Sequence, residues 1–535
     1  MTLSETVVER KAKEIKLNEA APVESKRDWK PYQRVAFRIT FIFFILMSVP
    51  TTPNWYTELA NINWTALHYR DIYDLARFSS GFGFVGNSLF GNNLNGYANW
   101  IITFLVAIAG GIVWSLLAKK SIKEYHIGYY WLRAIVRYRA GIGIIGFGFT
   151  KLFPVQMPYP SEALLNTNFG DFTAQKIYWL SIGIVPWYPG VRRVVELTAG
   201  VLLFFRGTAA IGAALLIGAL GSITFVNFAY DGGVHVYASY FVLLGSFVLA
   251  YYIPRLYSLL IKEQFTIPVD YYPTFSKAWE RWGRYTLKVG TSGVFVILLF
   301  YLQWVNFLYD PYKQPGLKGV TALRGFYNVA EFKINGKEIP YSPLDSIRWQ
   351  EATFERWTTL TYKVNKPHAL DLSNGGGAAM RDVNRTFEIA GVGGGRRAFY
   401  YEADTINRTL YLQDKNTAVL RRGDRDAAFQ AGALPNESKI KDDPDWIPKE
   451  ALANIGDENT RIDERGQSAR RTRGIPNERK RDDGRDKMVL TYETTDGSRV
   501  ILRGTNEKKD SLYIVLDRAS KDYALSRSTL DAGKY

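Results

Sequence analysis

Long apolar runs dominate the first part of the chain, whereas residues 310–535 read as a polar sequence with short alternating stretches. Each run approaches the roughly 20 residues that an α-helix needs to cross a bilayer. The runs lie at 35–51, 98–118, 134–153, 188–206, 208–227, 234–254 and 286–308. The pattern therefore predicts a membrane all-α bundle of about seven helices. A shorter apolar stretch at 174–187, ended by Pro186 and Pro189, predicts a half-helix or re-entrant piece.

Lysine and arginine favour alternate ends of these predicted helices. They cluster before the first run, between the second and third, and between the sixth and seventh, with Arg206 between the fourth and fifth. The other connections carry few of them. The positive-inside rule then places the tail 1–34 in the cytoplasm and, with seven spans, residues 310–535 outside. We expect a multi-pass protein of a bacterial inner membrane with a periplasmic C-terminal domain. The tail lacks a signal-peptide pattern, so we expect it to be retained.

The C-terminal part alternates apolar and polar residues in the manner of β-strands. Asn335 and Gly336 separate two such stretches, and both central residues of a type I′ turn need positive φ. Roughly eight to ten short strands predict a mostly-β antiparallel barrel or sandwich. Between them, residues 421–487 are dense in both charges and poor in large apolar residues. That composition predicts a charged insertion that is partly flexible or held by a partner.

Composition removes several classes of site. The 535 residues include no cysteine, which excludes disulfides, thiol catalysis, thiolate zinc sites and iron–sulfur clusters. The 4 histidines lie on different segments, so a three-histidine metal site is not expected. The net charge of +16 is explained first by membrane topology, and we expect no nucleic-acid partner. We therefore predict no metal and no haem, and leave a quinone or a lipid open as the ligand.

Ionisable residues inside apolar runs mark the candidate site, because they are costly there and usually face the bundle interior. Six of them map to the outer end: Lys151, Arg192, Arg193, Glu196, Asp231 and His235. Arg192 and Glu196 are four residues apart and share a helix face. One interpretation is a structural clamp of ion pairs. The other is a cationic pocket, in which Lys151 and an arginine face an anion or a quinone-like or lipid head group, and His235 exchanges protons beside Asp231.

Two further sets of residues carry predictions about packing and lipid. The inner arginines are expected to meet lipid phosphates: Arg137, Arg139 and Arg206. Four glycines in the third run are expected to let helices approach closely: Gly141, Gly143, Gly146 and Gly148. The first outer loop, 52–97, leads into "GFGFVGNSLFGNNLNGYANW" (81–100), a segment rich in glycine, asparagine and aromatic residues that we expect to lie over the mouth of the bundle.

Two stretches, "LRAIVRYRAGIGIIGFGFTKL" and "VVELTAGVLLFFRG", are followed by two more apolar runs. With them, residues 130–257 resemble the DoxX family of small four-helix membrane proteins. The resemblance implies a four-helix bundle at 128–257. Two helices at 35–127 and a cytoplasmic loop with a seventh helix at 258–309 are added around it. "LRGFYNVAEFKINGKEI" looks like a lipocalin-type opening strand, which implies a small barrel in residues 310–535.

The family resemblance also bears on function, since DoxX-like proteins are associated with membrane redox systems linked to quinones. Our leading expectation is an accessory or assembly subunit of a membrane complex. Its partners would be the lipid bilayer and other membrane or periplasmic proteins that contact the β domain. The segment "FTKLFPVQMP" resembles the membrane part of vitamin-K-dependent-carboxylase-like proteins. The alternative is therefore a quinone-linked redox or carboxylase-like enzyme at the outer charged cluster, and a transporter or channel is a third. Whether the protein is an enzyme stays open at this point.

Overall fold

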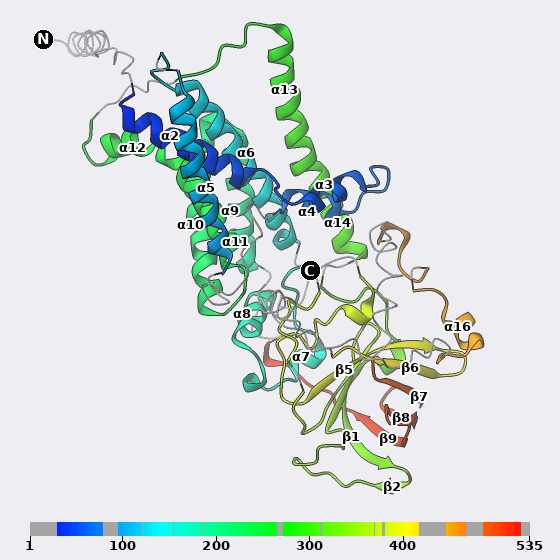
Figure 1. Ribbon diagram of the computed structural model, residues 1–535. Helices are drawn as coiled ribbons and strands as arrows, with labels where there is room; N and C mark the ends of the chain where they lie inside the picture. The colour runs from blue at the N-terminus through cyan, green and yellow to red at the C-terminus, as the bar shows by residue number, and fades with distance from the viewer. Residues whose placement is uncertain are drawn as a thin grey trace, which may run out of the picture.

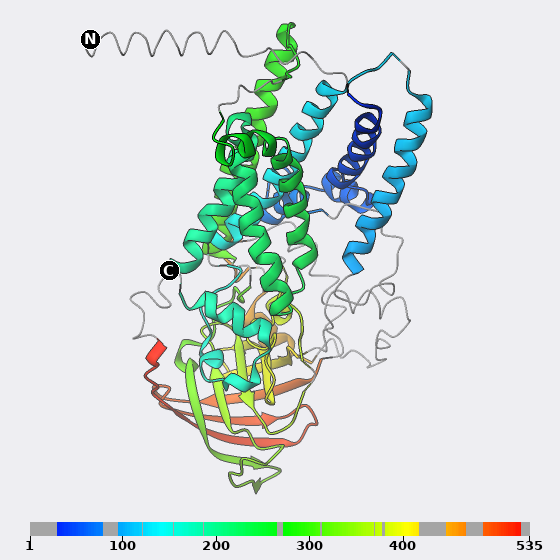
Figure 2. The same ribbon diagram turned by 90° about the vertical axis from the view of Figure 1, so that its left-hand side faces the viewer.

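The computed structural model describes most of the chain as a helical part followed by a β-barrel (Figure 1). The described residues are 29–78, 95–119, 121–153, 155–185, 187–264, 271–310, 313–368, 370–376, 380–416, 446–458, 460–466 and 485–525. The side chains at 54, 95 and 187–193 lie outside this description. The last helix of the bundle leads directly into the barrel (Figures 1 and 2).

The long helices occupy the seven positions that the apolar runs predict. They are α2 (Pro31–Ser48), α5 (Asn95–Leu117), α6 (His126–Leu152), α9 (Trp187–Phe204), α10 (Ala209–Ala229), α11 (His235–Ala250) and α13 (Ala278–Ser292), which continues through a π-helical segment (Gly293–Leu298) into α14 (Leu299–Tyr309). Short helices connect them: α3 (Pro53–Ala60), α4 (Tyr69–Ala76), α7 (Glu162–Leu165), α8 (Ala174–Gly183) and α12 (Ile253–Leu260). The apolar stretch at 174–187 thus contains α8, a short helix as expected.

Fewer helices are long and apolar enough to cross a membrane than the expected seven. Within the described residues there are 3, Gly96–Leu117, Arg206–Ala229 and Ala278–Tyr309, or up to 4 if α11 and α12, which are bent by 65°, form one span. The predicted count of seven membrane-spanning helices is therefore wrong when helix length and apolar composition are both required. Helix α6 carries three arginines and Lys151. The coarser expectation of a membrane protein remains supported.

Helices α6, α9, α10 and α11 form the centre of the bundle, each contacting the next, with α11 returning to α6. Glycines make the α6–α9 contact close. A Cβ at Gly141 would lie 2.9 Å from the carbonyl oxygen of Gly200, and one at Gly148 would lie 2.6 Å from the Leu197 side chain. Gly143 and Gly146 are similarly covered by Phe241 and Tyr73. The prediction that these four glycines allow close packing is confirmed.

The described first part of the outer loop, up to Phe78, packs into the bundle. Helix α4 buries Tyr69 and Tyr73 and contacts both α6 and α14. Arg139, midway along α6, donates to the carbonyl oxygens of Ala76 at 2.9 Å and Phe78 at 3.1 Å. A buried guanidinium needs such acceptors, and the loop backbone supplies them. The segment expected over the mouth of the bundle, 81–100, lies mostly outside the described residues, which omit 79–94, so that expectation stays a prediction.

The C-terminal domain is an antiparallel barrel of eight strands with a short ninth strand, β2, paired only to β1. The strands are β1 (Gly325–Ile334), β2 (Lys337–Glu338), β3 (Glu351–Phe354), β4 (Thr359–Lys363), β5 (Arg396–Asp404), β6 (Thr409–Asp414), β7 (Lys487–Glu493), β8 (Arg499–Thr505) and β9 (Ser511–Arg518). The barrel closes because β1 pairs with β9 as well as with β3. Asn335 has φ 50° and Gly336 φ 77°, which confirms the predicted hairpin turn.

The barrel is filled by its own side chains. Large residues from strands on all sides meet in one buried cluster, including Phe332, Phe354, Phe399, Leu412 and Ile514. Such an interior is typical of a small eight-stranded barrel. The general form is lipocalin-like. Its centre, however, is a packed core.

Part of the charged insertion packs on the barrel. Helix α16 (Lys449–Ile455) buries Ala451 and Ile455 against Tyr411 of β6. Just beyond it, Glu458 accepts a hydrogen bond from Arg381 at 2.8 Å. The described residues 446–458 and 460–466 are therefore ordered on the domain, and the rest of the insertion 421–487, up to 484, lies outside the described residues.

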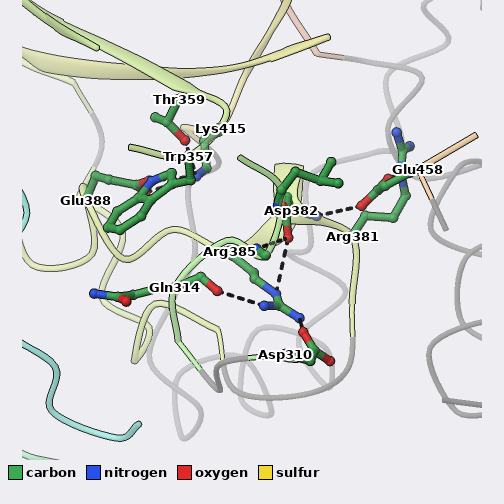
Figure 3. A network of polar contacts seen from close by, with 12 residues as sticks. Asp310, Gln314, Trp357, Thr359, Arg381, Asp382, Arg385, Glu388, Lys415 and Glu458 are labelled. Atoms are coloured by element: carbon green, nitrogen blue, oxygen red, sulfur yellow. Dashed lines mark hydrogen bonds and ion pairs between the residues drawn. The ribbon is translucent and has the colours of Figure 1, made fainter. Parts of the chain in front are cut away.

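A buried ion-pair network joins the last helix to the barrel domain (Figure 3). Asp310 follows α14 directly, and its carboxylate lies 2.5 Å from the guanidinium of Arg385, which is 1% exposed. Arg385 also donates to the carbonyl oxygen of Gln314 at 2.7 Å and lies 3.6 Å from Asp382. His68, at the start of α4, lies 3.9 Å from the other oxygen of Asp310. The network thus fixes α4, α14 and the barrel domain relative to one another.

Candidate functional site

A cavity of about 130 Å³ lies where the bundle meets the barrel domain. Helices α6, α8, α10 and α11 form most of its wall, and α4 and α9 complete it. Lys313 and Asn374 reach it from the C-terminal domain. Its lining is Tyr73, Arg77, Ile144, Phe147, Lys151, Gln156, Met157, Tyr178, Trp179, Ile182, Glu196, Leu220, Ile223, Asn227, Val234, Tyr237, Ala238, Phe241, Lys313 and Asn374.

The cavity is apolar toward the bundle and polar toward the barrel. On α6, Ile144 lies about two turns deeper in the bundle than Lys151, because the helix rises 1.5 Å per residue. On α10, Leu220 lies about two turns deeper than Asn227 by the same rise. Phe241 of α11 adds an aromatic ring to the deep end. The site therefore presents an apolar floor and a polar outer end, the shape that suits an amphipathic molecule.

An ion pair stands in the cavity wall. The Lys151 ammonium, in the last turn of α6, lies 2.5 Å from Oε1 of Glu196 on α9. Glu196 is 1% exposed, and its second oxygen, Oε2, is buried without a hydrogen-bond partner among the described residues. A buried carboxylate oxygen with no donor is costly, by about 1–3 kcal/mol. The pair therefore leaves one strong acceptor available at the cavity.

Aromatic rings hold Arg77 at the same cavity. Its guanidinium lies 5.3 Å from the ring centre of Phe147, 5.7 Å from that of Tyr237 and 5.9 Å from that of Tyr73. Such cation–π contacts are strongest where water is excluded. Close by, Oε1 of Gln156 is buried without a donor among the described residues, as is Glu196 Oε2. The polar end thus combines fixed cations with acceptors that lack a donor.

Lys313 brings a third cation to the cavity from beyond α14. Its ammonium donates to the backbone carbonyl oxygens of Asn374 and Gly376, and it lies 5.1 Å from the ring centre of Trp179. Burial lowers the pKa of Lys313 well below its usual value, and the nearby cation of Lys176 lowers it further. An anion placed in the cavity would reverse this effect by stabilising the charged form.

The structure brings together only part of the predicted outer cluster. Lys151 and Glu196 meet as a pair in the cavity wall. His235 is buried between the rings of Phe228 at 4.3 Å and Tyr97 at 6.2 Å, and Asp231 lies in the α10–α11 turn with φ 55°. Among the described residues, neither belongs to the cavity lining.

The predicted partners Arg192 and Arg193 lie on α9, but their side chains are outside the described part of the structure. The predicted pairing of Arg192 with Glu196 therefore stays a prediction.

The inner arginines differ from one another. Arg139 is buried against protein carbonyl groups, so the expectation that it faces lipid phosphates does not fit its position. Arg137 is also buried, with the ring of Tyr138 5.9 Å away. Arg206 is exposed and lies 3.7 Å from the ring centre of Tyr272. For Arg206 a lipid contact stays a prediction.

Several cavity residues were not singled out from the sequence. Arg77 lies in the loop 52–97 and interrupts no apolar run, and Lys313 falls just beyond the seventh run. Asn227 is an amide inside the apolar run 208–227, a signal of the kind that led to Glu196. Nothing local distinguishes Gln156. These residues meet because α4 enters the bundle and the barrel domain closes over its end, neither of which the sequence pattern predicts.

No family model, no curated protein and no solved structure matches this chain. The resemblance to the DoxX family therefore stays a prediction. Within the described ranges, no group of three or more His, Asp or Glu side chains is placed to hold a metal ion.

Proposed function

We propose that this protein holds an amphipathic molecule in the cavity between its bundle and its barrel domain. The single observation that carries the proposal is the polarity of the cavity. Its lining is mostly apolar, and Arg77, Lys151, Glu196 and Lys313 are among its polar members. A mostly apolar lining with a few convergent polar groups is the usual make-up of a site for a small organic molecule. A molecule with a polar head and an apolar body satisfies both ends at once.

The location of the cavity supports a ligand taken from the membrane. Segments predicted as cytoplasmic, among them α12 and the start of α13, lie at the end of the bundle remote from the barrel (Figure 1). The cavity lies at the opposite end, where α6 finishes and α11 begins. We propose that the bundle sits in a bacterial inner membrane with the barrel on the periplasmic side, so that the cavity lies near the outer head-group level.

Native mass spectrometry of the full-length protein, extracted gently from membranes, tests this proposal. The wild type should retain one tightly bound organic molecule per chain. Ala238→Phe places a ring in the cavity, since Ala238 is buried in its wall, and should abolish the adduct. The matched control is Ala214→Phe on the exposed side of α10, which should keep it. Equal adducts in all three proteins would refute binding in the cavity.

The accessory or assembly role stays a separate prediction. It expects stable membrane or periplasmic partners bound through the barrel domain. Pull-down from gently solubilised membranes checks it, and a protein that purifies alone with a measurable turnover would count against it. The transporter or channel alternative stays a prediction.

A further inference from the structure

Helix α12 exposes its apolar face more than its polar face. Large apolar residues share one face of the helix and its C-cap: Ile253, Leu256, Tyr257, Leu260 and Ile261. These five side chains are between 37% and 68% exposed, and no residue of α12 is buried. On the other face, Arg255 and Ser258 are less exposed. A helix whose outer side meets water turns its apolar face to the core, so the reverse arrangement indicates apolar surroundings outside the protein.

The bend before α12 turns the helix out of the direction of the bundle. It is bent by 65° relative to α11. With α11 upright in a bilayer, α12 runs nearer to the membrane plane than to the membrane normal. It lies at the end of the bundle remote from the barrel (Figure 1), which the proposed orientation places at the cytoplasmic head groups. An in-plane helix at that depth inserts its apolar face among the acyl chains.

The start of α13, at the same end of the bundle, carries a row of basic residues. Their spacing of four, three and four residues places them on one helix face: Lys277, Arg281, Arg284 and Lys288. The 32 residues of Ala278–Tyr309 are about 48 Å long, whereas the hydrocarbon core of a bilayer is about 30 Å thick. Residues 289–309 hold no charged side chain and are long enough to cross that core. The basic row therefore falls in the head-group layer.

The turn between α9 and α10 adds a further cation beside this row. The ammonium of Lys288 lies 4.3 Å from the ring centre of Phe205, which places the next residue, Arg206, close to α13. Arg206 is exposed, and its guanidinium lies 3.7 Å from the ring centre of Tyr272. Along the chain, residues 253–288 hold six basic and three acidic residues. The charge of this end of the bundle thus complements an anionic surface.

We infer that α12 and the first three turns of α13 form a surface that binds the anionic phospholipids of the cytoplasmic leaflet. Helix α12 is then an in-plane anchor with its apolar face among the acyl chains, and not the end of a span. The basic row on α13 and Arg206 contact the lipid phosphates. This inference rests on the proposed placement of the bundle in a membrane and is independent of the ligand in the cavity.

Single-cysteine labelling tests the position of α12, because the chain contains no other cysteine. Full-length protein is labelled with bimane and reconstituted into nanodiscs whose phospholipids carry a spin label on the upper acyl chain. The spin labels should quench Leu256→Cys about twofold or more beyond Ser258→Cys, which lies on the opposite face of α12. Leu105→Cys, exposed on α5, is the control within the membrane, and Leu344→Cys, exposed in the loop after β2, is the control outside it.

Two spin-labelled lipids with the same acyl chain, phosphatidylglycerol and phosphatidylcholine, test the preference for an anionic head. Leu287→Cys, exposed on α13, reports beside the basic row. At equal content, phosphatidylglycerol should quench this label about fivefold more, the enrichment that a single basic residue near an anionic surface provides. The preference should be lost when the row is neutralised by Arg281→Gln, Arg284→Gln and Lys288→Gln. It should survive a control that removes the same charge from the barrel surface: Lys337→Gln, Lys508→Gln and Lys509→Gln.

The outcomes separate this inference from the placement on which it rests. Quenching at Leu105→Cys without quenching at Leu256→Cys would overturn the inference and keep the bundle in the membrane. No quenching at Leu105→Cys would overturn the placement as well. A label at Leu256→Cys that neither the lipid nor aqueous iodide quenches would assign the apolar face to a protein contact and overturn the inference. Equal quenching of Leu287→Cys by the two lipids, a comparison that needs no charge variant to fold, would overturn the assignment to anionic lipid.

Discussion

The buried pair of Asp310 and Arg385 gives the sharpest test of how the two parts of the molecule are joined. Arg385→Met removes the guanidinium and keeps an apolar chain of similar reach. Asp310 then loses its cation while remaining in a site where it is only 2% exposed. The carbonyl oxygen of Gln314 loses its donor as well. The variant thus removes the cation that lies 2.5 Å from a buried carboxylate, while His68 stays 3.9 Å from its other oxygen.

The size of the effect follows from that burial. Removing one member of a buried pair costs about 3–5 kcal/mol of unfolding free energy. For a domain of this size each kcal/mol shifts the melting temperature by about 2–4 °C, so a decrease of about 6–20 °C is expected. In the double variant Arg385→Met with Asp310→Asn, a neutral amide replaces the carboxylate that lost its arginine. Part of the lost unfolding free energy, at least about 1 kcal/mol, should therefore return.

Thermal unfolding followed by tryptophan fluorescence in detergent measures these shifts. The matched control is Arg499→Ala, which breaks the Arg499–Asp517 ion pair on the barrel surface. The two charged groups lie 2.6 Å apart, but the side chains are 63% and 42% exposed. Screening by water limits that pair to about 0–1 kcal/mol. An Arg385→Met protein that melts like the Arg499→Ala protein would refute the claim that the buried network holds the barrel to α14.

Three further predictions concern stability. Burial raises the pKa of Glu355 to about 7 from 4.5, so the folded state binds the proton more tightly than the unfolded state. The free energy of unfolding should therefore fall as the pH rises from about 4.5 to about 7. Denaturant titrations of Glu355→Gln should show a flatter dependence on pH. Burial lowers the pKa of Lys176 to about 8 from 10.5, so the free energy of unfolding should rise between about pH 8 and 10.5. Lys176→Met should remove this rise. If the pH dependence of stability is the same in wild type and variant, the shifted pKa of Glu355 or of Lys176 is contradicted. Gly200→Ala should overpack the α6–α9 contact and lower the melting temperature, at a cost of about 1–3 kcal/mol of unfolding free energy. Gly218 has open space around it, so Gly218→Ala should not lower the melting temperature. Equal melting temperatures of the two variants would contradict the close α6–α9 packing.

The positions of the helices and the class of the C-terminal domain follow from periodicity. Apolar runs of about span length and alternating stretches ended by turn residues are local signals, and the Asn335–Gly336 hairpin is the clearest case. The span count failed because run length alone was used, although α6 carries several arginines. Those arginines are compatible with the bundle because Arg139 finds carbonyl acceptors in a loop distant in sequence.

The candidate site was predictable only where polar residues interrupt an apolar helix. Lys151 and Glu196 stood out for that reason, and they do meet. His235 stood out equally but packs between aromatic rings, because its place at the start of α11 turns it away from the cavity. Arg77 and Lys313 could not be found from their neighbours in sequence, since tertiary packing alone brings α4 and the chain after α14 to the cavity.

The central claim is that the cavity holds an amphipathic molecule, and a cryo-electron microscopy map of the protein in native membrane particles tests it most directly. The account predicts continuous non-protein density running from the apolar floor at Ile144 to a head beside Lys151, Glu196 and Lys313. A cavity that contains only isolated water-sized features, with the Lys151–Glu196 pair unchanged, would contradict it and assign the cluster to a structural clamp.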